Sequence, residues 1–281
     1  MSDLSIIEAV VLGALQGATE FLPVSSSGHL VIAQDLLGVQ LEGASLLAFD
    51  VCLHFGTLAA VIAVFWRDII QIVFGFFGKR YGSFASADVQ SPSESRKLGW
   101  MLILGTIPAV IAVLLFGDFF ESLVSDPLAA AFMLLVTGTI LWLTRFSKVS
   151  RTNSGLGWLK TIVIGCAQAA AIVPGISRSG STISAGLFFG IDRSLAAKFS
   201  FLLAVPAILG ATVLQLGELS ALSSDILLSV ALGTLVAAIV GFICIKWLLA
   251  LIKRGRFSIF AYYCWAAGLA TIVYKLFIHN S

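Results

Sequence analysis

A short polar stretch near the amino terminus carries the residue types that phosphoryl transfer needs. A carboxylate, a hydroxyl and an imidazole follow one another within a dozen residues, at Glu20, Ser26 and His29. A hydroxyl attacks phosphorus once a base removes its proton, and an imidazole can give or take a proton near neutral pH. Gln16 lies one helical turn before Glu20, so the two share a helix face. Taken singly, the serines would more often only cap a helix, and the histidine would more often be structural.

A second stretch, in the other half of the chain, repeats this pattern and adds a cation. Residues 174–182 read Pro-Gly-Ile-Ser-Arg-Ser-Gly-Ser-Thr, and alignment on the Ser-x-Ser-Gly turn places Arg178 opposite Ser26. The planar guanidinium of arginine suits phosphate oxygens, and the free amides at a helix start attract anions. We therefore expect a phosphate site between the two turns. Its candidate binding residues are Ser25, Ser27, Gly28, Ser177, Ser179, Gly180 and Thr182.

Plainer interpretations of these charged residues remain open. Arg178 could form a buried salt bridge with Glu20, and such a pair could coexist with phosphate binding. Glu20 could also lie in water on an amphipathic surface helix. The matched polar break in the other half argues against the second interpretation, since polar residues within apolar segments mark functional sites in membrane proteins. Asp50 and His54, one helical turn apart, could face the same cavity.

Composition places the chain among polytopic membrane proteins. It has 281 residues, of which 59% are hydrophobic and 11% charged, whereas a soluble domain has roughly a quarter charged residues. The net charge of +2 gives no reason to expect a nucleic-acid partner, and the lipid bilayer is the expected surrounding. The four cysteines lack metal-ligand spacing and are interpreted as small buried hydrophobic residues.

Several apolar runs are long enough to span a bilayer, which takes about 20 residues. They cover residues 46–66, 99–117, 127–144, 196–216, 226–250 and 257–277. Two further apolar regions, 4–37 and 159–190, are interrupted midway by the polar turns. Since lipid offers no hydrogen bonds, broken backbone at membrane depth is tolerated only within protein or beside a water-filled cavity. We predict an all-α integral membrane protein with six transmembrane helices and two re-entrant helical hairpins.

Basic residues predict the orientation, because cytoplasmic loops are enriched in Lys and Arg. Three loops are basic, and their residues are Lys79, Arg80, Arg96 and Lys97, then Arg145, Lys148, Arg151 and Lys160, then Lys253, Arg254 and Arg256. Placing all three in the cytoplasm makes the first hairpin enter from outside and the second from inside. The sequence thus predicts a single membrane domain, 1–281, with inverted-topology repeats at about 1–145 and 159–281. The site should face the outer, periplasmic side.

The two polar stretches closely resemble the motifs of the bacterial undecaprenyl-diphosphate phosphatase family, the bacitracin-resistance type called BacA or UppP. They are Gln16-Gly-Ala-Thr-Glu-Phe-Leu-Pro-Val-Ser-Ser-Ser-Gly-His29 and Pro174-Gly-Ile-Ser-Arg-Ser-Gly-Ser-Thr182, and the likeness extends over the whole chain. The resemblance implies a multi-pass enzyme of the bacterial plasma membrane. Such an enzyme removes one phosphate from undecaprenyl diphosphate and so recycles the lipid carrier of peptidoglycan synthesis. The family's serine, histidine and arginine map onto Ser26, His29 and Arg178.

The same resemblance implies a divalent cation, Mg²⁺ or Ca²⁺, with Glu20 and Gln16 as its candidate ligands. Gln at the first motif position removes one carboxylate from such a site. Ser26 is the first choice of nucleophile, Glu20 its base or the cation ligand, and His29 an acid or base toward the leaving oxygen or water. Whether Ser26 or His29 forms a covalent intermediate stays open. The expected partner is a polyprenyl diphosphate lipid, and a homo-oligomer is compatible with the sequence.

A rival hypothesis is an inverted-repeat transporter or flippase of a phosphorylated lipid. Inverted repeats with broken helices are typical of secondary transporters. A channel-like structural protein is a third hypothesis, but it leaves Arg178 unexplained. The serine, histidine and glutamate set favours an enzyme, because phosphate binding alone would not need it. Phosphate release from purified protein would distinguish the enzyme from its rivals.

Overall fold

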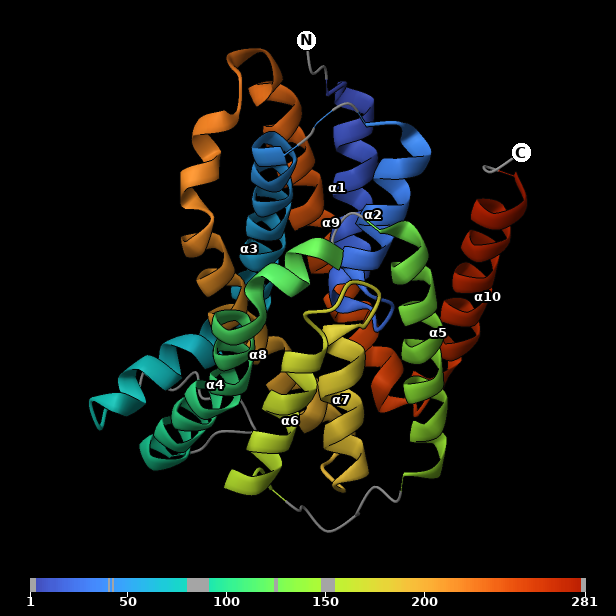
Figure 1. Cartoon of the computed structure of the whole chain (residues 1–281). Coiled ribbons are helices and arrows are strands. Elements are labelled where there is room, and N and C mark those ends of the chain that lie inside the picture. Colours follow the sequence, from blue (N-terminus) through green and yellow to red (C-terminus); the bar gives the residue numbers. More distant parts are fainter. Residues whose placement is uncertain are drawn as a thin grey trace.

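The computed structural model describes residues 4–39, 41, 43–79, 91–123, 126–147 and 155–278, and every regular element among them is helical (Figure 1). The α-helices are α1 (Ile6–Phe21), α2 (Ser26–Leu37), α3 (Gly43–Phe76), α4 (Pro92–Leu123), α5 (Pro127–Leu143), α6 (Trp158–Ala170), α7 (Arg178–Phe188), α8 (Arg193–Leu214), α9 (Leu227–Lys253) and α10 (Phe260–Val273). Shorter segments continue or join them: η1 (Thr144–Phe146), η2 (Leu216–Ala221), η3 (Ser224–Ile226), η4 (Phe257–Ile259) and η5 (Tyr274–Ile278).

The predicted transmembrane helices are confirmed. Among the described residues, six helical segments are long and apolar enough to cross a membrane: Gly43–Phe76, Pro92–Gly117, Pro127–Phe146, Arg193–Leu214, Ser224–Lys253 and Phe257–Phe277. Helix α3 continues beyond the predicted end at residue 66 and bends at Phe65, where φ is −107° and ψ is 19°. The chain is thus an all-helical, multi-pass membrane protein.

The two interrupted regions fold as helical hairpins, α1–α2 and α6–α7. Their helices have 16, 12, 13 and 11 residues, fewer than the roughly 20 that a span needs. In Figure 1 the two hairpins approach from opposite ends of the bundle, and their turns meet between those ends. A Cβ atom added to Gly28 would lie 2.8 Å from the Cα atom of Gly175, so the turns are in direct contact. The two glycines allow this close approach.

Helix α1 is fixed against α9 by small residues on both helices. Added Cβ atoms on Gly13 and Gly17 would meet the backbone of α9 at Gly233 and Ala237. Small residues four apart let helix backbones approach closely, and dispersion contacts then hold the helices together inside a membrane. This packing fixes α1 within the bundle, and it therefore positions Glu20, which lies in the last turn of α1.

Replacing Gly17 by alanine is expected to lower the melting temperature of the purified protein in detergent. The new Cβ atom would lie 2.5 Å from the Ala237 carbonyl oxygen and 2.9 Å from the Gly241 amide nitrogen. Overpacking of this kind costs about 1–3 kcal/mol. The matched control is Gly210→Ala, where an added Cβ atom meets nothing within 4 Å. A melting temperature that is equal in the two variants would contradict this packing argument.

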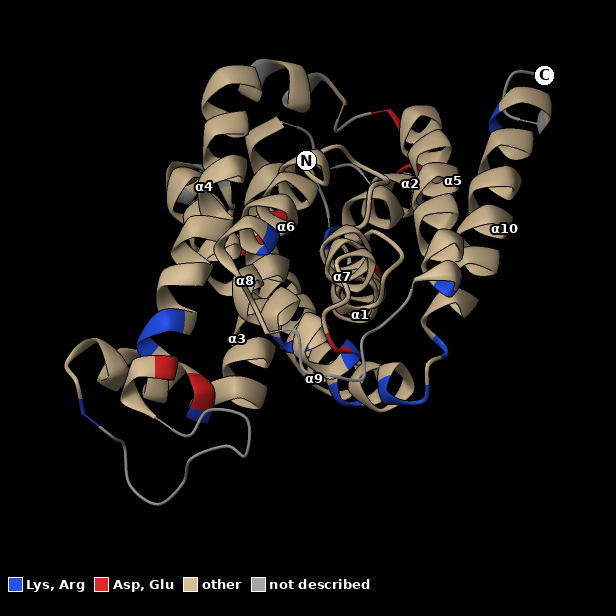
Figure 2. Ribbon diagram, turned by 90° about the horizontal axis from the view of Figure 1, so that it is seen from below, with Lys and Arg blue, Asp and Glu red and all other residues tan. Residues whose placement is uncertain are grey.

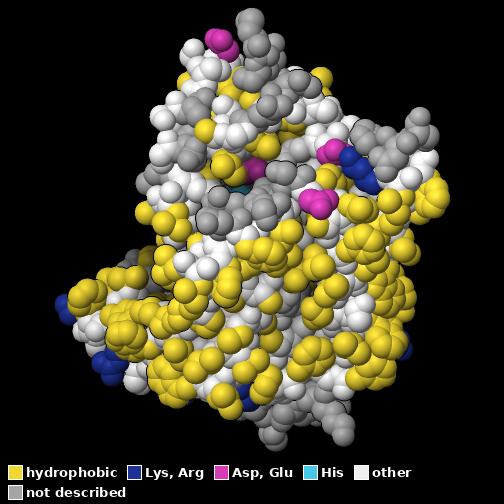
Figure 3. Space-filling model, viewed as in Figure 1, with side chains coloured by type: hydrophobic (Ala, Val, Ile, Leu, Met, Phe, Trp, Pro, Cys, Tyr) yellow, Lys and Arg dark blue, Asp and Glu magenta, His cyan; other side chains and the backbone are white. Residues whose placement is uncertain are grey.

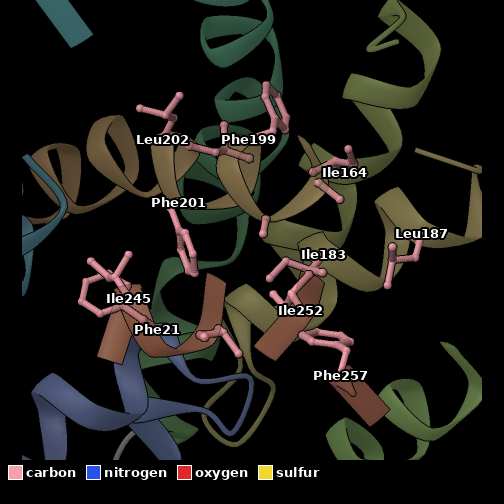
Figure 4. Close-up of a cluster of buried hydrophobic side chains, with 14 of the residues drawn as sticks. Phe21, Ile164, Ile183, Leu187, Phe199, Phe201, Leu202, Ile245, Ile252 and Phe257 are labelled. Atoms are coloured by element: carbon pink, nitrogen blue, oxygen red, sulfur yellow. The ribbon is translucent and has the colours of Figure 1, made fainter. Parts of the chain in front are cut away.

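A buried apolar cluster lies next to the two turns, where the hairpins pack against helices α8 and α9 (Figure 4). Phe201 of α8 packs edge-on against Phe21 of α1, with ring centroids 5.8 Å apart. Phe201 also contacts Phe65, at the bend of α3, with centroids 6.1 Å apart. The end of α1 is therefore held by aromatic packing as well as by α9. Together these contacts fix the position of the turn between α1 and α2 in the bundle.

Charged residues lie toward the ends of the molecule, and apolar side chains cover its middle. Figure 3 shows this apolar band, with Lys and Arg mostly toward the lower part of that face and Asp and Glu nearer the top, where one basic side chain also lies. Figure 2, drawn from below, shows Lys and Arg spread around the lower end of the bundle. Three residues of the predicted basic loops, Arg80, Lys148 and Arg151, lie outside the described residues. Both chain termini lie at the upper end (Figure 1).

Candidate active site

The two hairpin turns enclose a pocket with a volume of about 310 Å³. Helices α3 and α8 form its other walls. Its polar lining residues are Glu20, Ser25, Ser26, Ser27, His54, Ser177, Arg178, Thr212 and Gln215. Its apolar lining residues are Val51, Ala171, Ile172, Ile176, Ala207, Ile208 and Ala211. A hollow toward the upper end of the face in Figure 3 exposes an acidic side chain and a histidine.

Glu20 is the centre of the polar contacts in this pocket. Its Oε2 atom accepts a hydrogen bond from Ser26 Oγ at 2.5 Å and another from Gln16 Nε2 at 3.1 Å. Its Oε1 atom accepts from Arg178 Nη2 at 2.8 Å. The Glu20 side chain is only 5% exposed, and a buried carboxylate needs such donors to remain ionised. The salt bridge between Glu20 and Arg178, which the sequence analysis left open, is therefore present, and it joins the two hairpins.

The turn between α1 and α2, called the first turn, holds Ser26 beside Glu20 through the strained backbone of Ser25. Ser25 has φ 68° and ψ 100°, in the left-handed region that residues other than glycine rarely occupy. Its Oγ atom accepts a hydrogen bond from the Gly28 amide and so caps α2. Its carbonyl oxygen accepts from His29 Nδ1 at 2.8 Å. These two bonds stabilise the unusual backbone, which directs the next side chain, Ser26, toward Glu20.

Thr137 of α5 fixes the turn between α6 and α7, called the second turn. The sequence analysis did not identify this residue. The Thr137 hydroxyl donates to the carbonyl oxygen of Gly175 at 2.8 Å and accepts from the amide of Ser177 at 3.0 Å. Ser177 Oγ in turn caps α7 by accepting from the Gly180 amide at 3.0 Å. Ser179 Oγ donates to the carbonyl oxygen of Leu22, which ties the second turn to the first.

Half of the predicted site residues line the pocket, and the other half do not. Glu20, Ser25, Ser26, Ser27, Ser177 and Arg178 line the pocket; Gln16, Gly28, His29, Ser179, Gly180 and Thr182 do not. Gly28 and Gly180 supply the amides of the two caps. Thr182 Oγ1 is 2.6 Å from Ser200 Oγ, a contact between α7 and α8.

The two histidines near the turns differ in their surroundings. His29 is 8% exposed, and both of its ring nitrogens have protein partners: Nδ1 contacts the Ser25 carbonyl, and Nε2 lies 2.8 Å from the Tyr263 hydroxyl. The His29 ring also stacks on Tyr263, with centroids 5.6 Å apart. His54 is 32% exposed, lines the pocket, and has Nε2 3.8 Å from Glu20 Oε2. Of the two residues that the sequence analysis considered for the cavity, His54 lines the pocket and Asp50 does not.

The donor set at the turns does not fit a cation held by the protein alone. Glu20 is the one carboxylate among the pocket-lining residues, and both of its oxygens already accept from Arg178, Ser26 and Gln16. The guanidinium of Arg178 carries the positive charge that a cation would supply. Within the described part of the chain, no three His, Cys, Asp or Glu side chains gather as a metal site.

Comparison with known proteins gives a consistent result over nearly the whole chain. A family model described as bacitracin resistance protein BacA matches residues 9–270. A protein named undecaprenyl-diphosphatase from Methanobrevibacter smithii is 45% identical over 276 residues, which cover 95% of this chain and 96% of that protein. Proteins of the same name from Desulfatibacillum aliphaticivorans and Halothermothrix orenii are 42% and 41% identical, over 95% and 96% of this chain and 98% of each relative.

Proposed function

The chain belongs to the family of the bacitracin resistance protein BacA, and we propose that it hydrolyses undecaprenyl diphosphate to undecaprenyl phosphate and phosphate in the pocket between its two turns. One observation carries the chemistry: the Ser26 hydroxyl donates to Glu20 at 2.5 Å, in a pocket that Arg178 also lines. A hydroxyl paired with a carboxylate beside a guanidinium is a nucleophile, its base and an anion-binding group.

In the first step, Ser26 attacks the terminal phosphorus atom. The Ser26 oxygen forms a bond to phosphorus while its proton passes to Glu20, and the bond from phosphorus to the bridging oxygen breaks. Undecaprenyl phosphate leaves, and the phosphoryl group remains on Ser26. Arg178 and the amino-terminal ends of α2 and α7 face the charge that develops on the phosphoryl oxygens.

The apolar part of the pocket suits the other end of the substrate. Ile172 and Ile176 of the second turn, with Ala207, Ile208 and Ala211 of α8, form an apolar wall beside the polar turns. The diphosphate group lies against the turns in this arrangement, and the first isoprene units lie along α8. From there the polyprenyl tail passes sideways between helices into the lipid.

The arrangement of the hairpins supports an inverted-topology repeat with two re-entrant hairpins. The α1–α2 and α6–α7 hairpins approach from opposite ends and meet at a shared pocket (Figure 1). Basic residues at the lower ends of α3, α5 and α9 support a cytoplasmic position for that end. The pocket reaches Thr212 and Gln215, at the opposite end of α8 from Arg193, which supports an opening toward the outer side of the membrane.

Cysteine labelling tests this orientation. In a background without the four native cysteines, Ser223→Cys is expected to react with a membrane-impermeant thiol reagent in intact cells, whereas Ser93→Cys is expected to react only after lysis. Both serines are exposed: Ser93 lies in the first turn of α4, at the lower end of the bundle, and Ser223 lies between η2 and η3, at its upper end (Figure 1). Because serine is replaced by cysteine in both, reactivity reports the side of the membrane. The reverse labelling pattern would place the pocket on the cytoplasmic side.

The activity itself is tested by phosphate release. Protein purified in detergent is expected to release phosphate from undecaprenyl diphosphate and from the shorter farnesyl diphosphate, and Glu20→Gln is expected to lose most of that activity because a neutral amide cannot take the Ser26 proton. A transporter or flippase without chemistry would bind the lipid and release no phosphate. Release equal in wild type and Glu20→Gln would indicate a contaminating phosphatase.

A further inference from the structure

We propose that His54 is a further catalytic residue, the base that activates water in the second half of the reaction. This inference rests on the proposed function. It follows from the position of the Ser26 proton after the first step. After Ser26 attacks, Glu20 holds the proton that Ser26 lost. In the second step the Ser26 oxygen leaves phosphorus and must recover that proton, so Glu20 acts as an acid at that moment. The attacking water therefore needs a different base.

The pocket contains one group that fits this role. The titratable residues among its lining are Glu20, His54 and Arg178. Arginine remains protonated in proteins and has no acceptor atom, so Arg178 cannot take a proton from water. Glu20 is already protonated at this stage. This leaves His54, whose side chain is 32% exposed, compared with 5% for Glu20, and which can therefore contact a water molecule.

The hydrogen bonds of His54 hold it in the form that a base requires. Its Nδ1 atom lies 2.7 Å from the carbonyl oxygen of Asp50. A carbonyl oxygen can only accept, so Nδ1 carries a hydrogen, and in the neutral ring the lone pair is then on Nε2. Nε2 is the atom nearer the site, 3.8 Å from Glu20 Oε2. This distance is too long for a direct hydrogen bond, and it leaves Nε2 available to a water molecule at the phosphoryl group.

The backbone around His54 is tied to the first hairpin. The Asp50 carboxylate accepts a hydrogen bond from Gln34 Nε2 of α2 at 2.8 Å. Because α2 begins at Ser26, this contact links the helix that carries His54 to the helix that carries the nucleophile. His29 lacks such access, since its two nitrogens already contact Ser25 and Tyr263 behind the turn. We assign His29 a positioning role, in which it stabilises the Ser25 backbone.

The second step balances without any further reactant. The water oxygen bonds to phosphorus opposite Ser26, and one water proton passes to His54 Nε2. The bond from phosphorus to the Ser26 oxygen breaks, and that oxygen takes the proton held by Glu20. Phosphate leaves, His54 releases its proton to solvent, and all side chains return to their starting states. The first step needs no acid from His54, since a phosphate group with a second pKa of about 6 leaves readily as an anion.

The test is His54→Gln, assayed with farnesyl diphosphate labelled with ³²P in the terminal phosphate. Glutamine can hydrogen-bond but cannot take a proton at this position. The variant is expected to form phosphoserine at Ser26 at the wild-type rate and then to hydrolyse it about 10²-fold more slowly. Acid-quenched protein should therefore retain close to one label per chain, with a matching burst of farnesyl phosphate. Steady-state kcat should fall about 10²-fold.

Two further variants complete the design. Phe55→Leu changes the next residue of α3, which is 55% exposed and outside the pocket lining, and it should keep wild-type turnover and little label. His54→Ala opens space in the pocket, and added imidazole should restore part of its turnover as a replacement base. That rescue would not occur if His54 only supported the structure.

The outcomes separate this inference from the proposed function. If wild-type protein releases no phosphate, the proposed function fails. If wild type is active and His54→Gln turns over within threefold of it, or turns over slowly without labelled protein, the assignment of His54 as the base is wrong. Loss of label in the Ser26→Ala, His54→Gln double variant would confirm that the trapped phosphoryl group is on Ser26.

Discussion

Replacing Ser26 by alanine is expected to reduce kcat at least ~10³-fold while leaving the dissociation constant for a polyprenyl diphosphate nearly unchanged. The Ser26 hydroxyl donates its hydrogen to Glu20 at 2.5 Å, so its removal deletes both the nucleophile and the proton that Glu20 receives. The groups that face the diphosphate in the ground state, Arg178 and the ends of α2 and α7, stay in place. Single-turnover phosphate release and equilibrium binding of the lipid measure the two effects separately.

The matched control for this variant is Ser27→Ala. Ser27 also lines the pocket, but its Oγ atom lies 3.4 Å from Ser25 Oγ, and no contact with Glu20 is seen for it in the described structure. Its loss should lower kcat by no more than about tenfold. If Ser26→Ala stayed active while His29→Ala were inactive and the wild-type intermediate carried phosphohistidine, the nucleophile assignment would be wrong.

The broad architecture could be predicted because it depends on local sequence. Long apolar runs define the membrane helices through composition alone, and the six predicted spans agree with the helices observed. Pro23 and Pro174, each followed by a Ser-x-Ser-Gly turn, interrupt their segments through backbone chemistry that needs no tertiary partner. The meeting of Glu20 with Arg178 was also within reach, since a buried carboxylate and a buried guanidinium each require a partner.

The sequence could not show which side chains complete the site, because tertiary contacts decide this. Thr137 lies in the middle of an ordinary apolar span, and nothing in its surroundings along the chain indicates that its hydroxyl holds the second turn. Gly13 and Gly17 form a small-residue pattern that could have predicted close helix packing, although not its partner α9.

The two histidines show the same limit for chemistry. His29 adjoins the serines in sequence, which favours it as the acid or base, yet its ring turns back toward the Ser25 carbonyl and the hydroxyl of Tyr263, on α10. His54 is distant in sequence and reaches the pocket because α3 packs beside the turns. Sequence spacing gives distance along one helix, while the side on which a ring lies depends on the neighbouring helices.

Arg178→Lys is expected to lower kcat/KM at least tenfold, which corresponds to about 1.4 kcal/mol of transition-state stabilisation. The Arg178 fork already makes two contacts: Nη2 donates to Glu20 at 2.8 Å, and Nη1 donates to the Ser200 carbonyl oxygen at 3.4 Å. Arginine has five N–H donors in a rigid plane, so donors remain for phosphoryl oxygens while the ion pair persists. Lysine has one nitrogen, which can neutralise Glu20 or contact phosphate but cannot span both.

The measurement compares kcat/KM and inhibition by inorganic pyrophosphate in Arg178→Lys with those in Arg193→Lys, a control at the exposed start of α8, outside the pocket. The Arg178→Lys variant should keep its melting temperature, because the positive charge beside Glu20 remains, and it should need more pyrophosphate for half inhibition. Kinetics like those of wild type would show that Arg178 serves only as the structural partner of Glu20. A large loss of catalysis with an unchanged melting temperature would instead show that the fork itself contacts the substrate, because a purely structural ion pair is expected to tolerate lysine.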